Sequence, residues 1–241
     1  YDFWYQPRHN VMVSSELGAP NTYVPGFSLD DVAAGLYGRR LHFWDWQARR
    51  ITQTVDLGEE GLIPLEVRFH HNPDSTHGYV GAALSSTLWH WHKPNGTWAV
   101  EKSLGIPPVE VEGWPFPVPS LITDLLLSLD DRYLYLSNWL HGDIRQYDIT
   151  DPAHPRLVGQ VWCGGVLGKG ASVGGSSLAG GPQMLQLSLD GKRLYVTSSL
   201  LSSWDNQFYP DLAQKGSYLL QIDCDTEHGG LNINPDFYID F

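Results

Sequence analysis

The chain has 241 residues, a formal net charge of −12, 17% charged residues and 12% aromatic residues. Low charge combined with many aromatic side chains is typical of a folded protein with a large core and argues against an intrinsically disordered chain. The negative charge repels phosphate backbones, so we predict no nucleic-acid partner. No run approaches the roughly 18 consecutive apolar residues of a membrane-spanning helix, so we predict no transmembrane segment.

Two cysteines, Cys163 and Cys224, are too few for a disulfide framework. We expect both to be small buried side chains, and a reducing compartment is then the simpler interpretation. The location predicted for the protein is therefore the cytoplasm.

The first half of the chain predicts two units of four short strands each, residues 1–58 and 59–118. In the first unit, alternating apolar residues predict strands over 3–6, 11–16, 41–46 and 51–57. The second unit predicts strands over 64–69, 79–86, 87–92 and 98–103. One helical turn is expected at 30–35, between the second and third strands of the first unit.

The second half predicts two more such units, residues 119–178 and 179–241. Each opens with a hairpin whose first strand ends at an aspartate, and Asp130 and Asp190 lie 60 residues apart. Asp190 is followed by Gly191, and Asp-Gly between alternating apolar runs is a strong hairpin signal. The stretch 164–181 between the two hairpins is rich in Gly and Ser and predicts a flexible loop.

Four-stranded units that repeat along a chain are typical of β-propeller blades. We therefore predict an all-β fold with four propeller blades, in which the first strand of each blade lines a central channel. The chain begins and ends inside strand-like runs, which we interpret as the mark of a fragment whose other blades lie elsewhere. A blade cannot bury both faces by itself, so each should pack against its neighbours.

Two His-Asn pairs occupy equivalent places in the first two units. His9–Asn10 and His71–Asn72 both follow the opening strand. Equivalent positions in neighbouring blades meet at one level of the channel, so His9 and His71 are candidate metal ligands, with the asparagines orienting them. In the other interpretation, both are turn histidines bonded to backbone.

A second polar cluster is predicted at the opposite rim. His141 lies between the second and third strands of the third unit, and Glu16 ends the second strand of the first unit, beside Ser15. Asp124 opens the third unit near the same level. His141 and Glu16 are therefore the candidate catalytic residues, while a shallow polar rim is the alternative.

The remaining histidines give weaker signals. We expect five of them on the surface or at sheet edges, namely His42, His90, His92, His154 and His228. His90 and His92 lie on one face of a strand, which is a weak metal signal. The sequence shows no dense carboxylate cluster of the kind that would hold a hard cation.

Several long motifs resemble the selenium-binding protein family. They are YDFWYQPRHNVM (1–12), AGLYG (34–38), GLIPLEVRF (61–69), HNP (71–73), SNWLHGD (137–143), AGGPQM (179–184) and WDNQFYP (204–210). The resemblance covers nearly the whole chain. It implies a seven-bladed propeller of which this chain is the C-terminal part.

The resemblance also implies a function. It implies copper-dependent oxidation of a small thiol, methanethiol, with O2 and water to formaldehyde, hydrogen sulfide and hydrogen peroxide. His9 and His71 would be copper ligands, completed by family histidines in the N-terminal blades and near the C-terminus. The family's selenium-associated cysteine lies outside this chain, so neither Cys163 nor Cys224 takes its role.

A second function stays open on the same residues. A non-catalytic propeller would bind selenium species or a protein partner on its rim. The Trp-rich surface and the Pro-rich loop at 114–119 would support such binding. Copper at about one ion per chain would favour the enzyme over the binding module.

Overall fold

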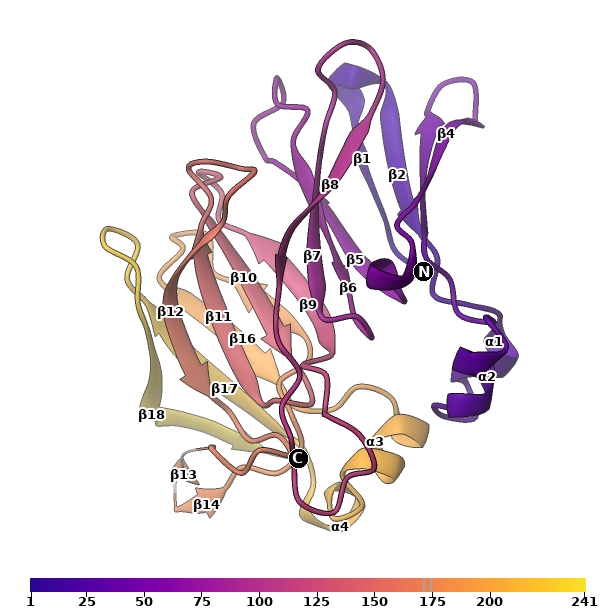
Figure 1. Cartoon of the computed structure of the whole chain (residues 1–241). Helices are drawn as coiled ribbons and strands as arrows, with labels where there is room; N and C mark the ends of the chain where they lie inside the picture. Colours follow the sequence, from indigo (N-terminus) through magenta and orange to yellow (C-terminus); the bar gives the residue numbers. More distant parts are fainter. Residues whose placement is uncertain (171, 174) are drawn as a thin grey trace.

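A computed structural model describes residues 1–170, 172–173 and 175–241. Its main elements are four four-stranded antiparallel sheets, each ordered from its first strand to its fourth. Figure 1 shows these sheets side by side in chain order, from indigo to yellow. The first strands of neighbouring sheets contact each other, β1 with β5, β5 with β9 and β9 with β15. This arrangement confirms the predicted all-β fold and its propeller blades.

Blades 1 and 2 follow the predicted strands closely. Blade 1 consists of β1 (Phe3–Gln6), β2 (Val11–Ser15), β3 (Arg40–Asp45) and β4 (Arg50–Asp56). Blade 2 consists of β5 (Pro64–Phe69), β6 (Gly78–Ala82), β7 (Thr87–His92) and β8 (Ala99–Gly105). Short 3-10 turns, Pro7–His9 and Glu59–Gly61, precede β2 and β5.

Blades 3 and 4 contain the repeated hairpin. Blade 3 consists of β9 (Ile122–Leu127), β10 (Tyr133–Asn138), β11 (Asp143–Asp148) and β12 (Arg156–Trp162). Blade 4 consists of β15 (Leu185–Leu187), β16 (Arg193–Thr197), β17 (Tyr218–Cys224) and β18 (Leu231–Asp240). Both first hairpins close alike, because Asp130 and Asp190 each accept a serine hydroxyl two residues earlier at 2.5 Å.

Helices occur in two insertions at one end of the sheets (Figure 1). The first insertion, between β2 and β3, holds α1 (Pro20–Tyr23) and α2 (Leu29–Ala33). The predicted helical turn is α2, and Ser28 caps it by accepting the Asp31 backbone N–H. The second insertion, between β16 and β17, holds α3 (Ser202–Phe208) and α4 (Leu212–Lys215), which the sequence did not predict.

The Gly-rich stretch 164–181 carries a two-stranded hairpin, β13 (Ser172–Val173) and β14 (Ser176–Ser177). The prediction of a flexible loop also covers residues 171 and 174, which lie outside the described residues. Among the described helices, none is long and apolar enough to cross a membrane.

The hydrophobic core lies between blades. One cluster joins blades 1 and 2, where the rings of Phe43 and Trp98 stack at 4.7 Å and Trp91 is fully buried. Equivalent clusters join blades 2 and 3 and blades 3 and 4. Because each blade buries its faces only against its neighbours, these clusters fix how the inner strands line up along the channel.

Candidate functional site

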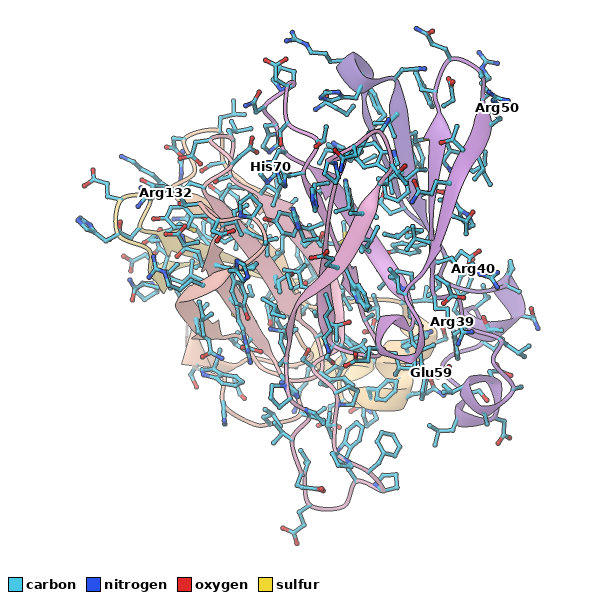
Figure 2. All side chains as sticks on the ribbon, turned by 45° about the horizontal axis from the view of Figure 1, so that its top comes forward. Arg39, Arg40, Arg50, Glu59, His70 and Arg132 are labelled. Carbon is cyan, nitrogen blue, oxygen red and sulfur yellow. The ribbon has the colours of Figure 1, made fainter. Side chains whose placement is uncertain are left out.

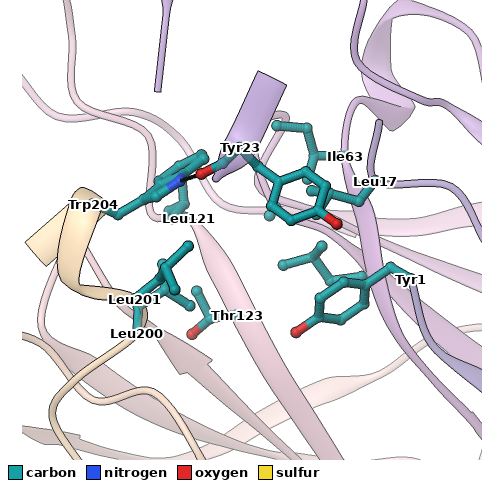
Figure 3. Close-up of a pocket in the computed structure, with 11 residues that line it drawn as sticks. Tyr1, Leu17, Tyr23, Ile63, Leu121, Thr123, Leu200, Leu201 and Trp204 are labelled. Atoms are coloured by element: carbon teal, nitrogen blue, oxygen red, sulfur yellow. Dashed lines mark hydrogen bonds between the residues drawn. The ribbon is translucent and has the colours of Figure 1, made fainter. Parts of the chain in front are cut away.

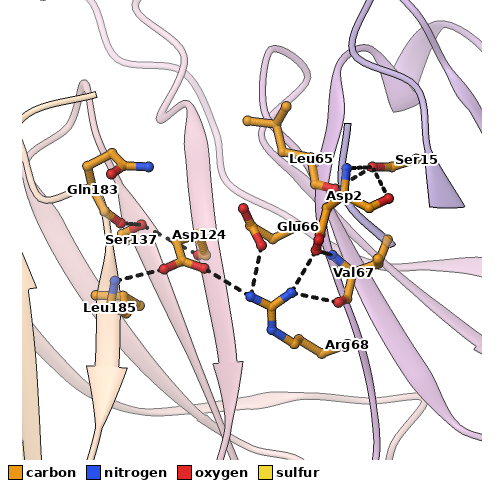
Figure 4. Close-up of polar contacts among 10 residues, drawn as sticks. All are labelled: Asp2, Ser15, Leu65, Glu66, Val67, Arg68, Asp124, Ser137, Gln183 and Leu185. Atoms are coloured by element: carbon orange, nitrogen blue, oxygen red, sulfur yellow. Dashed lines mark hydrogen bonds and ion pairs between the residues drawn. The ribbon is translucent and has the colours of Figure 1, made fainter. Parts of the chain in front are cut away.

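The inner strands bring four charged side chains together in the channel (Figure 4). Arg68 on β5 lies 2.7 Å from Asp2 Oδ2, 2.8 Å from Glu66 Oε2 and 3.8 Å from Asp124 Oδ1. We call Asp2, Glu66, Arg68 and Asp124 the channel cluster. The sequence showed no dense carboxylate cluster that would hold a hard cation, and these three carboxylates instead surround the Arg68 guanidinium. Asp2, Glu66 and Asp124 are about 60 residues apart in sequence, so only the radial arrangement of the blades joins them.

Two of the carboxylates also hold blades together. In each link, an aspartate accepts a backbone N–H of the next blade, and a serine on β2 or β10 donates to a nearby carbonyl of that blade. For blades 1 and 2, the bonds are Val67 N to Asp2 Oδ2 (2.9 Å) and Ser15 Oγ to Leu65 O (2.6 Å). For blades 3 and 4, they are Leu185 N to Asp124 Oδ2 (2.7 Å) and Ser137 Oγ to Gln183 O (2.7 Å). We call each pair of bonds a blade clasp.

Glu66 differs from these aspartates. Among the described residues, it has no backbone N–H as a partner, and its side chain is 10% exposed. Burial, followed by the charges of Asp124 and Asp2, raises the pKa of Glu66 to about 8 against the attraction of Arg68. Burial also raises the pKa of Asp124 to about 7, although the Leu185 N–H and Arg68 favour its charged form. The pKa values of Glu66 and Asp124 therefore lie much closer to neutral pH than those of ordinary carboxyl groups.

An apolar cavity of about 250 Å³ lies in the channel toward the helices (Figure 3). Its lining comes from blades 1, 2 and 3 and from both helical insertions, and comprises Tyr1, Leu17, Tyr23, Ile63, Leu65, Ala83, Leu121, Thr123, Leu200, Leu201 and Trp204. Leu65 and Thr123 directly precede Glu66 and Asp124 in the chain, so two lining residues of the cavity are chain neighbours of the channel cluster.

A second cavity, of about 370 Å³, contains the predicted metal ligand His71. Arg68, Asp124 and Met184 line it as well, so the channel cluster borders this cavity. His71 Nε2 lies 3.3 Å from the Leu127 carbonyl oxygen. The structure thus places His71 beside the channel cluster and also gives it the backbone partner of the alternative interpretation.

His9 lies in a different cavity, of about 400 Å³, with Trp44, Lys93 and Trp98. Its Nε2 atom is buried without a hydrogen-bond partner in the described structure. Asn10 does not orient it, because the Asn10 amide bonds to Asp45 and to the Gln47 backbone N–H.

The described residues do not complete a metal site on their own. No group of three or more His, Cys, Asp or Glu among them is placed to hold a metal ion. His9 and His71 line different cavities, so a copper site on either would need ligands from elsewhere in the protein. Their role as a ligand pair stays a prediction.

The predicted catalytic residues His141 and Glu16 have separate partners. His141 is 1% exposed, its Nε2 lies 3.0 Å from the Val118 carbonyl, and burial lowers its pKa. Glu16 Oε1 lies 2.8 Å from His42 Nε2. The third member predicted for this cluster, Asp124, belongs to the channel cluster instead. No hydrogen bond of the described residues joins His141 to Glu16, and their catalytic role stays a prediction.

Four histidines gather at the rim between blades 2 and 3, where Figure 2 labels His70. Successive rings of this histidine quartet lie 5.0–5.7 Å apart, and its members are His70, His77, His90 and His92. His77 Nδ1 and His90 Nε2 are 2.7 Å apart. The prediction that His90 is a surface or sheet-edge residue is wrong, because it is 3% exposed and lies on β7, between β6 and β8. The alternation along β7 placed His90 and His92 on one face, but His70 and His77 join them only through the β5–β6 turn.

Comparison with known sequences places the whole chain in one family. The model of the 56 kDa selenium-binding protein (SBP56) family matches residues 1–241. Methanethiol oxidase of Homo sapiens is 58% identical and that of Xenopus tropicalis 57% identical, each over 100% of this chain and 55% of the relative. The chain therefore spans about half the length of these curated relatives.

Solved structures agree on the fold. A hypothetical selenium-binding protein from Sulfolobus tokodaii matches with a TM-score of 0.94 and 41% identity, over 100% of this chain and 55% of that chain. The β-propeller domain of Cps50 from Myceliophteria thermophila matches with a TM-score of 0.51 and 11% identity, over 90% of this chain and 49% of that chain, which supports the fold alone. The chain belongs to the 56 kDa selenium-binding protein family.

Proposed function

We propose that the protein containing this chain oxidises methanethiol, with O2 and water, to formaldehyde, hydrogen sulfide and hydrogen peroxide. The observation that carries the proposal is the match to relatives named methanethiol oxidase at 57–58% identity over 100% of this chain. Because the chain covers 55% of those relatives, the proposal concerns the whole protein.

The channel supports this chemistry through Glu66. A thiol must lose its S–H proton before sulfur acts as a nucleophile or a metal ligand, and a cysteine-like thiol has a pKa of about 8.5. Glu66 has a pKa of about 8 and lies deep in the channel. Proton transfer is efficient when the two pKa values match, so Glu66 is suited to accept the thiol proton. Arg68, 2.8 Å from Glu66, would stabilise the carboxylate that accepts it.

Copper is the cofactor that we propose. Bound copper would pass electrons from the substrate to O2, and both thiolate and imidazole are ligands that it accepts. His71 is the better placed of the two predicted ligands, because its cavity is also lined by Arg68 and Asp124. Since the described residues lack a three-ligand group, the remaining ligands would come from other parts of the protein.

The test uses the full-length protein purified with copper present. Copper content and methanethiol-dependent peroxide release are measured for the wild type, for His71→Ala and for a matched control, His154→Ala, whose ring is 81% exposed. We expect about one copper per chain and peroxide release in the wild type and the control. His71→Ala should lose both, and normal copper with normal turnover in that variant would contradict the assignment.

Binding of selenium species without catalysis is the second candidate, favoured by the description of the family. The cysteines of this chain do not support it. Cys163 and Cys224 are both free and buried. Burial raises the pKa of Cys224 to about 12 and that of Cys163 still further, which disfavours the reactive thiolate. Selenite binding that persists in the Cys163→Ser and Cys224→Ser variants would place that site elsewhere.

A further inference from the structure

The apolar cavity in the channel is covered by a contact between the two helical insertions. Trp204 on α3 donates its indole N–H to the Tyr23 carbonyl at 2.8 Å. The Gln207 side chain accepts the Phe27 backbone N–H at 2.7 Å and donates to the Phe27 carbonyl at 3.1 Å. These contacts join blade 1 to blade 4 across about 180 residues. We call the α1–α2 insertion and α3 together the strap.

The walls below the strap offer almost no polar group to a ligand. Ile63, Leu65, Ala83 and Leu121 line the cavity, and each is no more than 6% exposed. The hydroxyl of Thr123 already pairs with Ser137 Oγ at 3.1 Å. A cavity of this kind disfavours water and accepts a small apolar group. Charged thiols would leave an ammonium or a carboxylate unpaired there, which is costly.

The charged groups nearest to the cavity are those of the channel cluster. Tyr1 lines the cavity, and burial together with the nearby charge of Glu66 raises the pKa of its phenol. Leu65 and Thr123 connect the apolar walls directly to Glu66 and Asp124 along β5 and β9. A small molecule with an apolar tail and one ionisable head would therefore fit in one orientation, with its head toward Glu66.

We propose that this cavity binds the alkyl group of a small uncharged thiol, with the sulfur toward Glu66, and that Ala83 limits the length of that alkyl group. The inference rests on the proposed thiol oxidation and adds the place and size limit of substrate binding. It predicts a preference for short unbranched thiols over cysteine and glutathione. In the wild type, each further CH2 that the cavity buries should tighten binding about fourfold.

The experiment compares methanethiol, ethanethiol and 1-propanethiol with cysteine on the full-length protein. Equilibrium binding is measured by calorimetry, and turnover is measured by peroxide release. Ala83→Leu fills the cavity, so it should weaken binding of 1-propanethiol at least tenfold and that of methanethiol much less. Ala213→Leu, at an exposed position on α4, is the matched control and should change neither.

A second variant keeps the proposal testable if Ala83→Leu does not fold. Leu200→Ala enlarges the cavity and should shift preference toward the longer thiols, in binding and in KM. Equal effects on all three alkyl thiols, or tight binding of cysteine, would overturn the cavity proposal while leaving thiol oxidation intact. If Ala83→Leu loses 1-propanethiol binding but the wild type turns over no thiol, the result would support alkyl-group binding in the cavity. It would reject the proposed thiol oxidation.

Discussion

At the scale of single residues, Glu66 is the carboxylate of the channel cluster that takes no part in a blade clasp, so it is the one suited to catalysis. Asp2 and Asp124 have similar charges, but each is engaged in a blade clasp. Glu66 pairs with Arg68, and its pKa is raised to about 8. Residues with raised pKa values in a channel are typical of functional sites, and among the two clasp aspartates Asp124 also has a raised pKa.

We predict that Glu66→Gln slows methanethiol oxidation by roughly 10²–10⁴-fold, the range for loss of a general base. The copper content and thiol binding should stay near wild-type values. The matched variant is Glu59→Gln, because Glu59 is 84% exposed at its side chain. The measurement is kcat and kcat/KM for peroxide release between pH 6 and pH 9. Unchanged turnover across that range would exclude Glu66 as the proton acceptor.

At the scale of elements, the histidine quartet makes the β5–β6 turn and β7 sensitive to pH. Burial lowers the pKa of His70 to about 4 and that of His90 to about 3, and each is lowered further by neighbouring imidazoles. An unfolded histidine takes up its proton near pH 6.5. Below that pH the unfolded chain binds protons that the folded chain does not, so the free energy of unfolding falls.

We predict that the full-length protein loses roughly 1–2 kcal/mol of stability per buried histidine as the pH falls from about 6.5 toward 4. His90→Gln should be less stable at pH 8, because the 2.7 Å contact with His77 changes, but its stability should depend less on pH. The control is His228→Gln, whose ring is 81% exposed. Denaturant unfolding at several pH values gives the slopes, and equal slopes in His90→Gln and the wild type would refute the explanation.

At the scale of the whole molecule, neighbouring blade interfaces are held together by different contacts. Blades 1–2 and 3–4 share the clasp of one aspartate and one serine. Between blades 2 and 3, Gly81 on β6 lies against Ile122 on β9. A Cβ atom there would lie 2.7 Å from Ile122 Cγ2, so glycine lets β9 approach β6 closely. The clasps set the position of Asp2 and Asp124, and hence the shape of the channel cluster.

We predict that Ser15→Ala and Ser137→Ala each destabilise the protein by about 1–3 kcal/mol, because each leaves a buried carbonyl unpaired. The two effects should add, since the two serines lie in different blade interfaces and donate to different carbonyls. Ser103→Ala removes a bond within blade 2 and is the control. Native-state hydrogen exchange at Leu65–Val67 and at Gln183–Leu185 reports each interface. Protection that is unchanged in both variants would show that the clasps do not hold the blades.

The sequence predicted much of the fold because its signals are local. Alternation along 64–69 and 87–92 gave β5 and β7 without error, and the turns at Asp130 and Asp190 appear as predicted. Helix α3 was missed because its amphipathic pattern is only seven residues long, and it is stabilised by a distant contact with Tyr23.

The amino-acid sequence by itself determined the strands, the repeat and the family of this protein, because side-chain alternation, turn residues and motifs are properties of neighbouring positions. Only the tertiary structure decided which polar residues meet. It joined Asp2, Glu66 and Asp124 around Arg68, and it placed His9 and His71 in different cavities. The physical reason is that the channel is built from one strand of each blade, so its chemistry depends on contacts about 60 residues apart.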